Sequence, residues 1–299
     1  MPVKEVQAQT VTESDLHKMV SSLYDIQHAR IIIGNRFHER KENNLIAFIE
    51  GMEGLEKNVK LLIKGEVQQY PIHKWIISQK GLSYDMAGQL IGLIQDIKRF
   101  DNISKLWAYF GLAVVDVCQD CGKRWYPLNQ KAEKILKLSK RLMEQHEKKI
   151  VKEGRSDFAK VASEMFCSCK EPHIKKTTQR KMKESMIDYN PQAKMVAYKV
   201  GVQFVKQGDL YRKLYDQFRA EYELREDLKA ERETKQGKKT KNGESKGTAH
   251  IHNMAQRKTV KIFLQHLWVE WRTLEGLPVS MPYVMDRMGH SDYIQPKAV

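Results

Sequence analysis

The most distinctive spacing in the chain is that of Trp75-Ile-Ile-Ser-Gln-Lys-Gly-Leu-Ser-Tyr-Asp-Met-Ala-Gly-Gln-Leu-Ile91. Its apolar residues lie at helical spacing on both sides of Gly81-Leu-Ser83, which predicts two helices joined by a tight turn. This spacing is typical of a helix-hairpin-helix, in which backbone N–H groups at the start of the second helix bind a phosphate. Ser83 stands where the motif usually has a second glycine, and its hydroxyl is expected to cap the second helix. Two helices joined by an ordinary glycine turn are the alternative.

Helical periodicity continues on both sides of this stretch. Apolar residues from Leu16 to Ile26, and again from Leu45 to Ile63, recur at every third or fourth position, which predicts a helical hairpin or coiled coil. We expect this apolar stripe to pack in the core, with dimerisation of two chains as the alternative. Further helices are predicted at 103–110, from Pro191 onward and at 252–271.

All four cysteines lie in two close pairs, Cys118-Gln-Asp-Cys121 and Cys167-Ser-Cys169. Four thiolates in two tight turns can converge on zinc, and Gly122 lets the backbone turn beneath the metal. His173 is close enough in sequence to replace one cysteine as a ligand. Four protein ligands fill a tetrahedral shell, so we expect a structural Zn²⁺ that performs no chemistry. Buried or redox-inert cysteines are the alternative.

These patterns predict a mainly α fold, namely a helical bundle with a helix-hairpin-helix element and a small zinc-ribbon-like insert. Residues 131–152, between the cysteine pairs, predict one amphipathic helix, and no alternating β-branched stretch is long enough for a larger sheet. We divide the chain into an N-terminal helical hairpin or coiled coil (1–70), a helix-hairpin-helix-like core (71–117), zinc knuckles with a helical insert (118–173), a basic helical part (174–233), a disordered basic linker (234–250) and a C-terminal helix and tail (251–299).

The charge is strongly basic. The 299 residues include 52 Lys and Arg against 37 Asp and Glu, a net charge of +15, which favours a polyanionic partner. Residues 170–261 hold 23 Lys and Arg against 12 Asp and Glu. Tyrosines interleave with these basic residues, which is compatible with stacking on bases, although tyrosines on helix faces more often pack against the protein.

No apolar run reaches the roughly 18 residues that a membrane-spanning helix needs, and no secretory leader opens the chain. We therefore expect no membrane association and a cytoplasmic, nucleoid-associated location.

Several segments in order resemble the C-terminal transposase domain of the DEDD-type insertion-sequence transposases. These are families one-hundred-and-ten and one-hundred-and-sixteen, which include the Piv-type invertases and the RNA-bridged recombinases. Residues 80–91 resemble the family's hairpin, Asp96-Ile-Lys-Arg-Phe100 its "DI-x-RF" block and Lys105 to Leu112 its "L-x-x-Y-x-GL" block. The resemblance covers roughly residues 70–275. Its later blocks, from Asn190 onward, are individually weaker.

The chain also departs from this family. The resemblance implies an N-terminal RNase-H-like domain with four Mg²⁺-binding acidic residues, but 1–70 reads only as helical. It further implies a nucleophilic serine soon after Gly111-Leu112, where this chain has Cys118 and no serine before Ser139. Ser168 lies between two expected zinc ligands and is better read as a spacer. We therefore assign no catalytic residue.

The favoured hypothesis is a protein that binds DNA, or DNA with a guide or structured RNA, derived from a transposase C-terminal domain without its own nuclease centre. One alternative is a transposase or recombinase whose acidic catalytic domain is supplied by a separate subunit. Another is a helical, oligomerising interaction subunit that forms a homodimer through its N-terminal helices. The candidate nucleic-acid-binding residues are Lys80, Gly81, Leu82, Ser83, Tyr84, Lys175, Lys176, Arg180, Lys181, Lys183, Lys194, Lys199, Arg257, Lys258 and Lys261.

Overall fold

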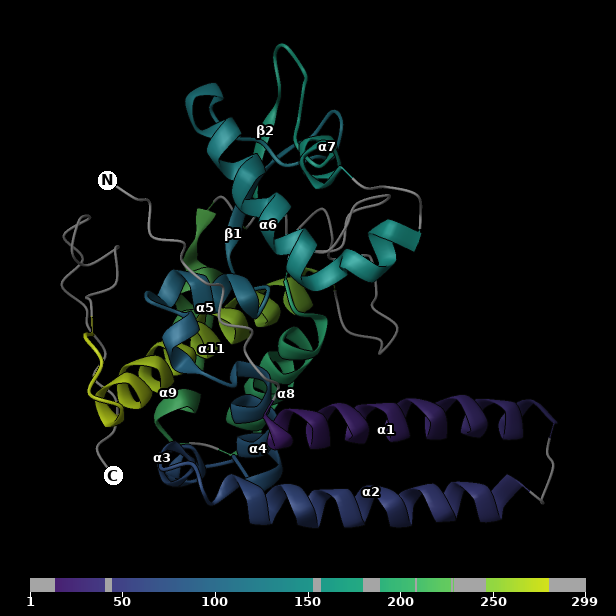
Figure 1. The fold of residues 1–299 in the computed structure, drawn as a ribbon. Helices are drawn as coiled ribbons and strands as arrows, with labels where there is room; N and C mark the ends of the chain where they lie inside the picture. Colours follow the sequence, from purple (N-terminus) through teal and green to yellow (C-terminus); the bar gives the residue numbers. More distant parts are fainter. Residues whose placement is uncertain are drawn as a thin grey trace, which may run out of the picture.

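The protein is mainly helical, with a single two-stranded sheet in the part of the chain that is described (Figure 1). The computed structural model describes residues 14–40, 45–152, 157–179, 189–207, 209–226, 228 and 246–279. Within these ranges, no helix combines the length and the apolar content needed to cross a bilayer.

The predicted pair of helices around Gly81 is confirmed as α3 (Ile72–Ser78) and α4 (Tyr84–Ile94). Gly81 has a φ of +97°, and a Cβ at this position would lie 2.9 Å from the Cγ of Gln207, at the end of α8 (Pro191–Gln207). Both the backbone conformation and the close contact therefore require glycine. Ser83 is the N-cap residue, but its hydroxyl makes no capping hydrogen bond, so that prediction is wrong.

The N-terminal region forms a helical hairpin of α1 (Asp15–Arg40) and α2 (Leu45–Val67), which projects from the body of the molecule (Figure 1). Only the base of the hairpin packs deeply, where Leu16, Val20 and Ile63 are buried against α4. Gly88 of α4 makes this packing close, because a Cβ there would lie 2.2 Å from the Cγ2 of Ile63.

One large core joins the hairpin base to the remaining helices of the body. These are η1 (Ile97–Arg99), α5 (Ile103–Tyr109), α8, α9 (Leu210–Leu224) and α11 (Lys246–Leu274). Asp96 and Asn102 cap η1 and α5 by accepting hydrogen bonds from backbone N–H groups. Trp268, on α11, is buried and donates its indole N–H to the carbonyl of Phe100 at 2.7 Å.

A smaller unit is inserted between α5 and α8. Strands β1 (Val114–Cys118) and β2 (Ile174–Thr178) pair antiparallel, with Val114 opposite Thr178 and Cys118 opposite Ile174. Helices α6 (Leu128–Lys152) and α7 (Phe158–Glu164) pack on each other. Their second core is separate from the first and consists of Leu138, Leu142, Val161, Ala162, Met165 and Phe166.

Two boundaries differ from the sequence predictions. The helix expected at 131–152 begins at Leu128. Helix α11 begins at Lys246, so the last five residues of the expected linker 234–250 are helical, while 234–245 lie outside the described residues. The apolar period that identified the C-terminal helix starts only at Ile251, because its first turn contains lysine, glycine and threonine.

Candidate metal centre and basic cleft

The first cysteine pair lies in a tight turn that begins at the end of β1. The N–H of Gly122 donates to the carbonyl of Cys118 at 2.9 Å, and the N–H of Cys118 donates to the carbonyl of Lys123, also at 2.9 Å. Gly122 has a φ of +71°, the left-handed conformation that glycine adopts without strain. The expected glycine turn beneath the cysteines is therefore present.

The second cysteine pair follows α7 and is held against the first by the backbone. The N–H of Cys167 donates to the carbonyl of Arg124 at 2.6 Å, and the N–H of Arg124 donates to the carbonyl of Met165. The N–H of Cys169 donates to the sulfur of Cys167 at 3.3 Å, which closes the short turn around Ser168. Backbone contacts thus bring together two pairs that are far apart in the sequence.

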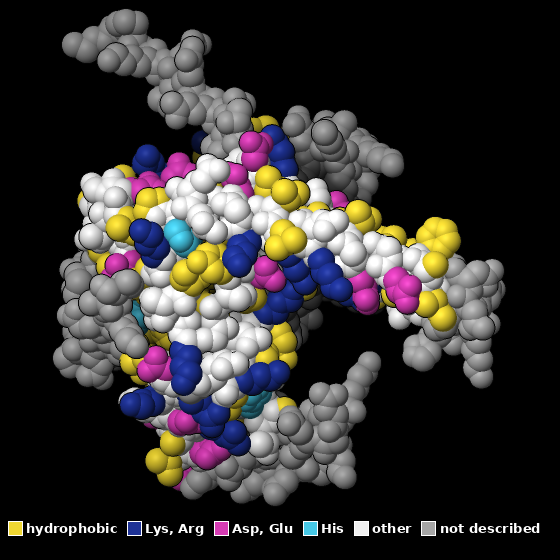
Figure 2. Space-filling model, turned by 90° about the horizontal axis from the view of Figure 1, so that it is seen from below, with side chains coloured by type: hydrophobic (Ala, Val, Ile, Leu, Met, Phe, Trp, Pro, Cys, Tyr) yellow, Lys and Arg dark blue, Asp and Glu magenta, His cyan; other side chains and the backbone are white. Residues whose placement is uncertain are grey.

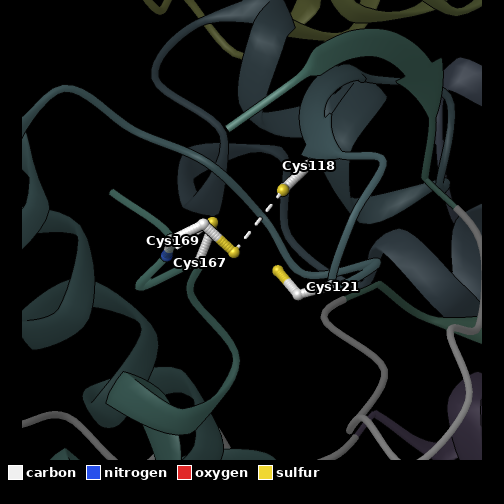
Figure 3. A group of neighbouring side chains, drawn as sticks. All are labelled: Cys118, Cys121, Cys167 and Cys169. Atoms are coloured by element: carbon white, nitrogen blue, oxygen red, sulfur yellow. Dashed lines mark hydrogen bonds between the residues drawn. The ribbon is translucent and has the colours of Figure 1, made fainter. Parts of the chain in front are cut away.

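The four sulfur atoms converge (Figure 3). Those of Cys118, Cys121, Cys167 and Cys169 all lie within 4.8 Å of one another, and the sulfurs of Cys118 and Cys169 are 3.9 Å apart. Ligands about 2.3 Å from a tetrahedral zinc ion would be about 3.8 Å apart, so the spacing suits such an ion. Cys118 and Cys167 are buried and Cys121 is exposed. The structure therefore holds a cluster of four cysteines in a geometry compatible with a metal such as zinc.

His173 lies outside this cluster. Its Nδ1 is 3.0 Å from a carboxylate oxygen of Asp120, and its backbone N–H donates to the same carboxylate. The backbone bond, the imidazole and the Cys118 thiol together lower the pKa of Asp120 to about 2. The sequence proposed His173 as a substitute ligand, whereas here it positions Asp120 beside the cysteine turn.

The cysteine sulfurs affect one another's ionisation. Hydrogen bonds with the thiols of Cys167 and Cys121 raise the pKa of Cys169 to about 12, with smaller contributions from burial and Cys118. A thiolate there would add negative charge beside other sulfurs. These contacts favour the protonated thiol. A bound metal cation would favour the thiolate instead, because the thiolate is the form that binds a metal. This donor set is therefore suited to holding a soft divalent metal with all four positions filled by protein.

A cleft of about 960 Å³ lies beside the cysteine cluster, between the β1–β2 ribbon and α11. Lys175 and Lys176 on β2 and Arg257 on α11 line it, together with Cys118. Three of the predicted nucleic-acid-binding residues, from segments distant in the sequence, thus line one cleft. Lys175 and Lys176 are consecutive in β2, so their side chains leave opposite faces of the ribbon, and Asp116 of β1 lies opposite Lys176. Among the described residues that line the cleft, none is acidic.

Burial lowers the pKa of Arg257, so its guanidinium is partly removed from water. Arg257 also lines a smaller neighbouring pocket of about 150 Å³, which it shares with Lys194. Lys194 donates to the carbonyl of Gln179 and lies over the ring of Tyr189, 4.5 Å from its centre. Lys194 therefore has partners within the chain, although it lies close to Arg257.

The other predicted basic residues have protein partners. Lys258 pairs with Glu221 at 2.9 Å and lies over the ring of Phe218. Lys261 is 4.1 Å from the centre of the Trp107 ring, and burial lowers its pKa. Lys199 lies over the ring of Tyr24, and burial and the nearby Lys60 lower its pKa. Arg180, Lys181 and Lys183 lie outside the described residues.

The turn from Lys80 to Tyr84 is not part of the cleft. Leu82 is buried in the main core, and Gly81 packs against Gln207 of α8, so these two residues have structural roles. Asp85, in the first turn of α4, already places a carboxylate where a phosphate would bind. Lys80 and Ser83 are exposed and Tyr84 is half-buried.

Most of the lining residues were not among the predicted site residues, and two of them, His250 and Met254, lie on α11. They precede Arg257 by seven and three positions and so share its helix face. This spacing is visible in the sequence, but the expected linker 234–250 includes His250, which the structure places in α11.

Comparisons of the chain with protein-family models, with curated proteins and with solved structures found no match.

Proposed function

We propose that this protein binds nucleic acid, DNA or structured RNA, in the basic cleft between the β1–β2 ribbon and α11. The observation that carries the proposal is the meeting of Lys175, Lys176 and Arg257 in one cleft without an acidic side chain among the described lining residues. Lysine and arginine are the side chains that neutralise backbone phosphates. Contacts with phosphates contribute affinity and position the protein on the nucleic acid, but they do not distinguish one base sequence from another.

Arg257 is suited to binding a phosphate because its guanidinium is partly buried. Burial disfavours its charge, and among the described residues no carboxylate forms an ion pair with it. A phosphate in the cleft would supply the missing negative charge to a partly desolvated guanidinium, which favours binding more than contact with a fully hydrated lysine.

The metal has a supporting role in this proposal. Cys118 is the last residue of β1 and pairs with Ile174, directly before Lys175. A zinc ion bound by the four cysteines would hold the end of the ribbon to the turn after α7, as in a small zinc ribbon. It thereby fixes the strand that carries both cleft lysines and takes no part in chemistry.

The transposase ancestry belongs to the same proposal. The residues on which the resemblance rests have structural roles in this chain. Asp96 caps η1, and Trp107 and Phe110 pack in the main core. Gly111 adopts a φ of +67°. We assign α3 and α4 to the helix-hairpin-helix-like element of such a domain, with its turn packed on α8 in place of phosphate contact. A cytoplasmic, nucleoid-associated location follows from this function.

The test is binding of the full chain to duplex DNA and to structured RNA. Lys175→Ala/Lys176→Ala should weaken binding at least tenfold, because two of three phosphate contacts are removed. The matched control is Lys140→Ala/Lys160→Ala, which removes the same charge from exposed sites on α6 and α7, outside the cleft. Equal losses in both variants would show that binding follows net charge alone, and the cleft would not be the site.

A further inference from the structure

Helix α2 presents an uncharged surface to solvent along the whole projecting hairpin. Phe48 is 64% exposed, Leu55 54% and Leu62 59%, each seven residues after the last. We call this surface the outer face of α2. It comprises Ala47, Phe48, Gly51, Gly54, Leu55, Asn58, Leu61, Leu62 and Gly65.

The opposite side of the same helix is already packed within the chain. Ile63 and Val67 are buried in the main core, and Glu56 is buried with its carboxylate paired to Arg30 of α1. Helix α2 is therefore apolar on two sides, with only one covered. A helix of a monomeric protein normally has one apolar stripe, which faces the core, and polar residues on the opposite side.

Glycines give a second indication. A Cβ added at Gly51, Gly54 or Gly65 would meet nothing within 4 Å, so no contact inside the chain requires a glycine there. Each costs the helix about 1 kcal/mol relative to alanine. Their positions belong to the series 47, 51, 54, 58, 61 and 65, whose alternating steps of four and three are the spacing of a helix–helix seam. Glycine on such a seam allows a second backbone to approach closely.

The charges beside the outer face indicate the partner. Along α2, Glu50 and Glu53 lie in the first half, and Lys57, Lys60 and Lys64 follow in the second, before Glu66 at the base of the hairpin, which accepts a hydrogen bond from Gln69. Figure 2 shows acidic side chains nearer the tip of the hairpin and basic ones nearer the body. Each helix is thus complementary to a reversed copy of itself, whereas a parallel copy would oppose like charges.

We propose that two copies of this chain associate through the outer faces of α2, antiparallel, about a two-fold axis near Leu55. In an antiparallel pair the same flank of each helix meets, so Glu50 of one copy faces the basic end of the other. Leu55 packs against its own counterpart, and Phe48 packs against the second copy's Leu62. This inference is independent of nucleic-acid binding.

The test is the mass of the full chain in solution, by light scattering during size exclusion. The wild-type chain is expected at twice 35.0 kDa. Leu55→Ser should raise the dissociation constant at least tenfold, whereas Leu136→Ser, at a leucine 57% exposed on α6, should leave it unchanged. Both positions are exposed, so neither change disturbs a folded core.

Charge exchange tests the antiparallel arrangement. Glu50→Lys/Glu53→Lys should weaken association, and adding Lys60→Glu/Lys64→Glu to the same chain should restore it, because the two halves become complementary again. A wild-type chain that stays monomeric at about 100 µM would overturn the proposal and assign the face to a different protein. A dimer unaffected by both Leu55→Ser and the charge changes would overturn it equally.

Discussion

Gly88 allows α4 of the body to pack closely against Ile63 at the base of the hairpin. Its position on α4 leaves no room for a side chain, because a Cβ would lie 2.2 Å from the Cγ2 of the buried Ile63. Interior positions of this kind tolerate added volume poorly, since neighbouring side chains must leave their rotamers.

We predict that Gly88→Ala lowers the free energy of unfolding by about 1–3 kcal/mol, measured by urea denaturation. Gly34→Ala on α1 is the matched control, because a Cβ there meets nothing within 4 Å. That change should be neutral or should stabilise the protein by up to about 1 kcal/mol, as alanine favours the helix. Similar effects from both substitutions would contradict the packing described at the base of the hairpin.

At the scale of elements, the cysteine turns and the β1–β2 ribbon depend on each other. The ribbon has only two strands, and a pair of this length is marginal without further support. The small core of α6 and α7 supplies part of it. The four cysteines would supply the rest once they hold a metal.

We predict about one zinc ion per chain in the reduced protein, measured by elemental analysis. Cys121→Ser should abolish stoichiometric zinc and lower the thermal stability of the inserted unit, because a ligand is lost from a closed site. His173→Ala should keep the metal, since His173 lies outside the cluster. Metal retained in Cys121→Ser, or lost in His173→Ala, would show that the ligand set is different.

The sequence predicts this organisation unevenly. The paired cysteines and Gly122 identify the cluster because their spacing alone restricts the chemistry, and helical periodicity locates most helices. The cleft is not predictable in this way, since β2 and α11 are far apart in the sequence and line the same cleft only in the folded chain. Lys258 and Lys261 contact Glu221 and Trp107 because α11 packs against α9 and α5. The proximity of Gln207 to the Gly81 turn is likewise not visible in the sequence, and phosphate binding at this turn stays a prediction.

At the scale of the whole molecule, the net charge of +15 is divided among different tasks. Some cations stabilise the fold by lying over aromatic rings, as Lys261 does over Trp107 and Lys194 over Tyr189. Others flank the outer face of α2. Only Lys175, Lys176 and Arg257 line the large cleft among the described residues. Net charge alone therefore overstates the surface available to a polyanion.

Binding of nucleic acid in the basic cleft is tested by the dependence of affinity on salt concentration. Three phosphate contacts predict that affinity falls about 40-fold between about 50 and about 200 mM salt, since each contact releases a counterion. In Lys175→Ala/Lys176→Ala the slope of log affinity against log salt concentration should become shallower by about two. The affinity of this variant should then fall only about fourfold over the same range of salt. An identical slope in the wild-type chain and this variant, or an affinity insensitive to salt, would contradict binding in the cleft.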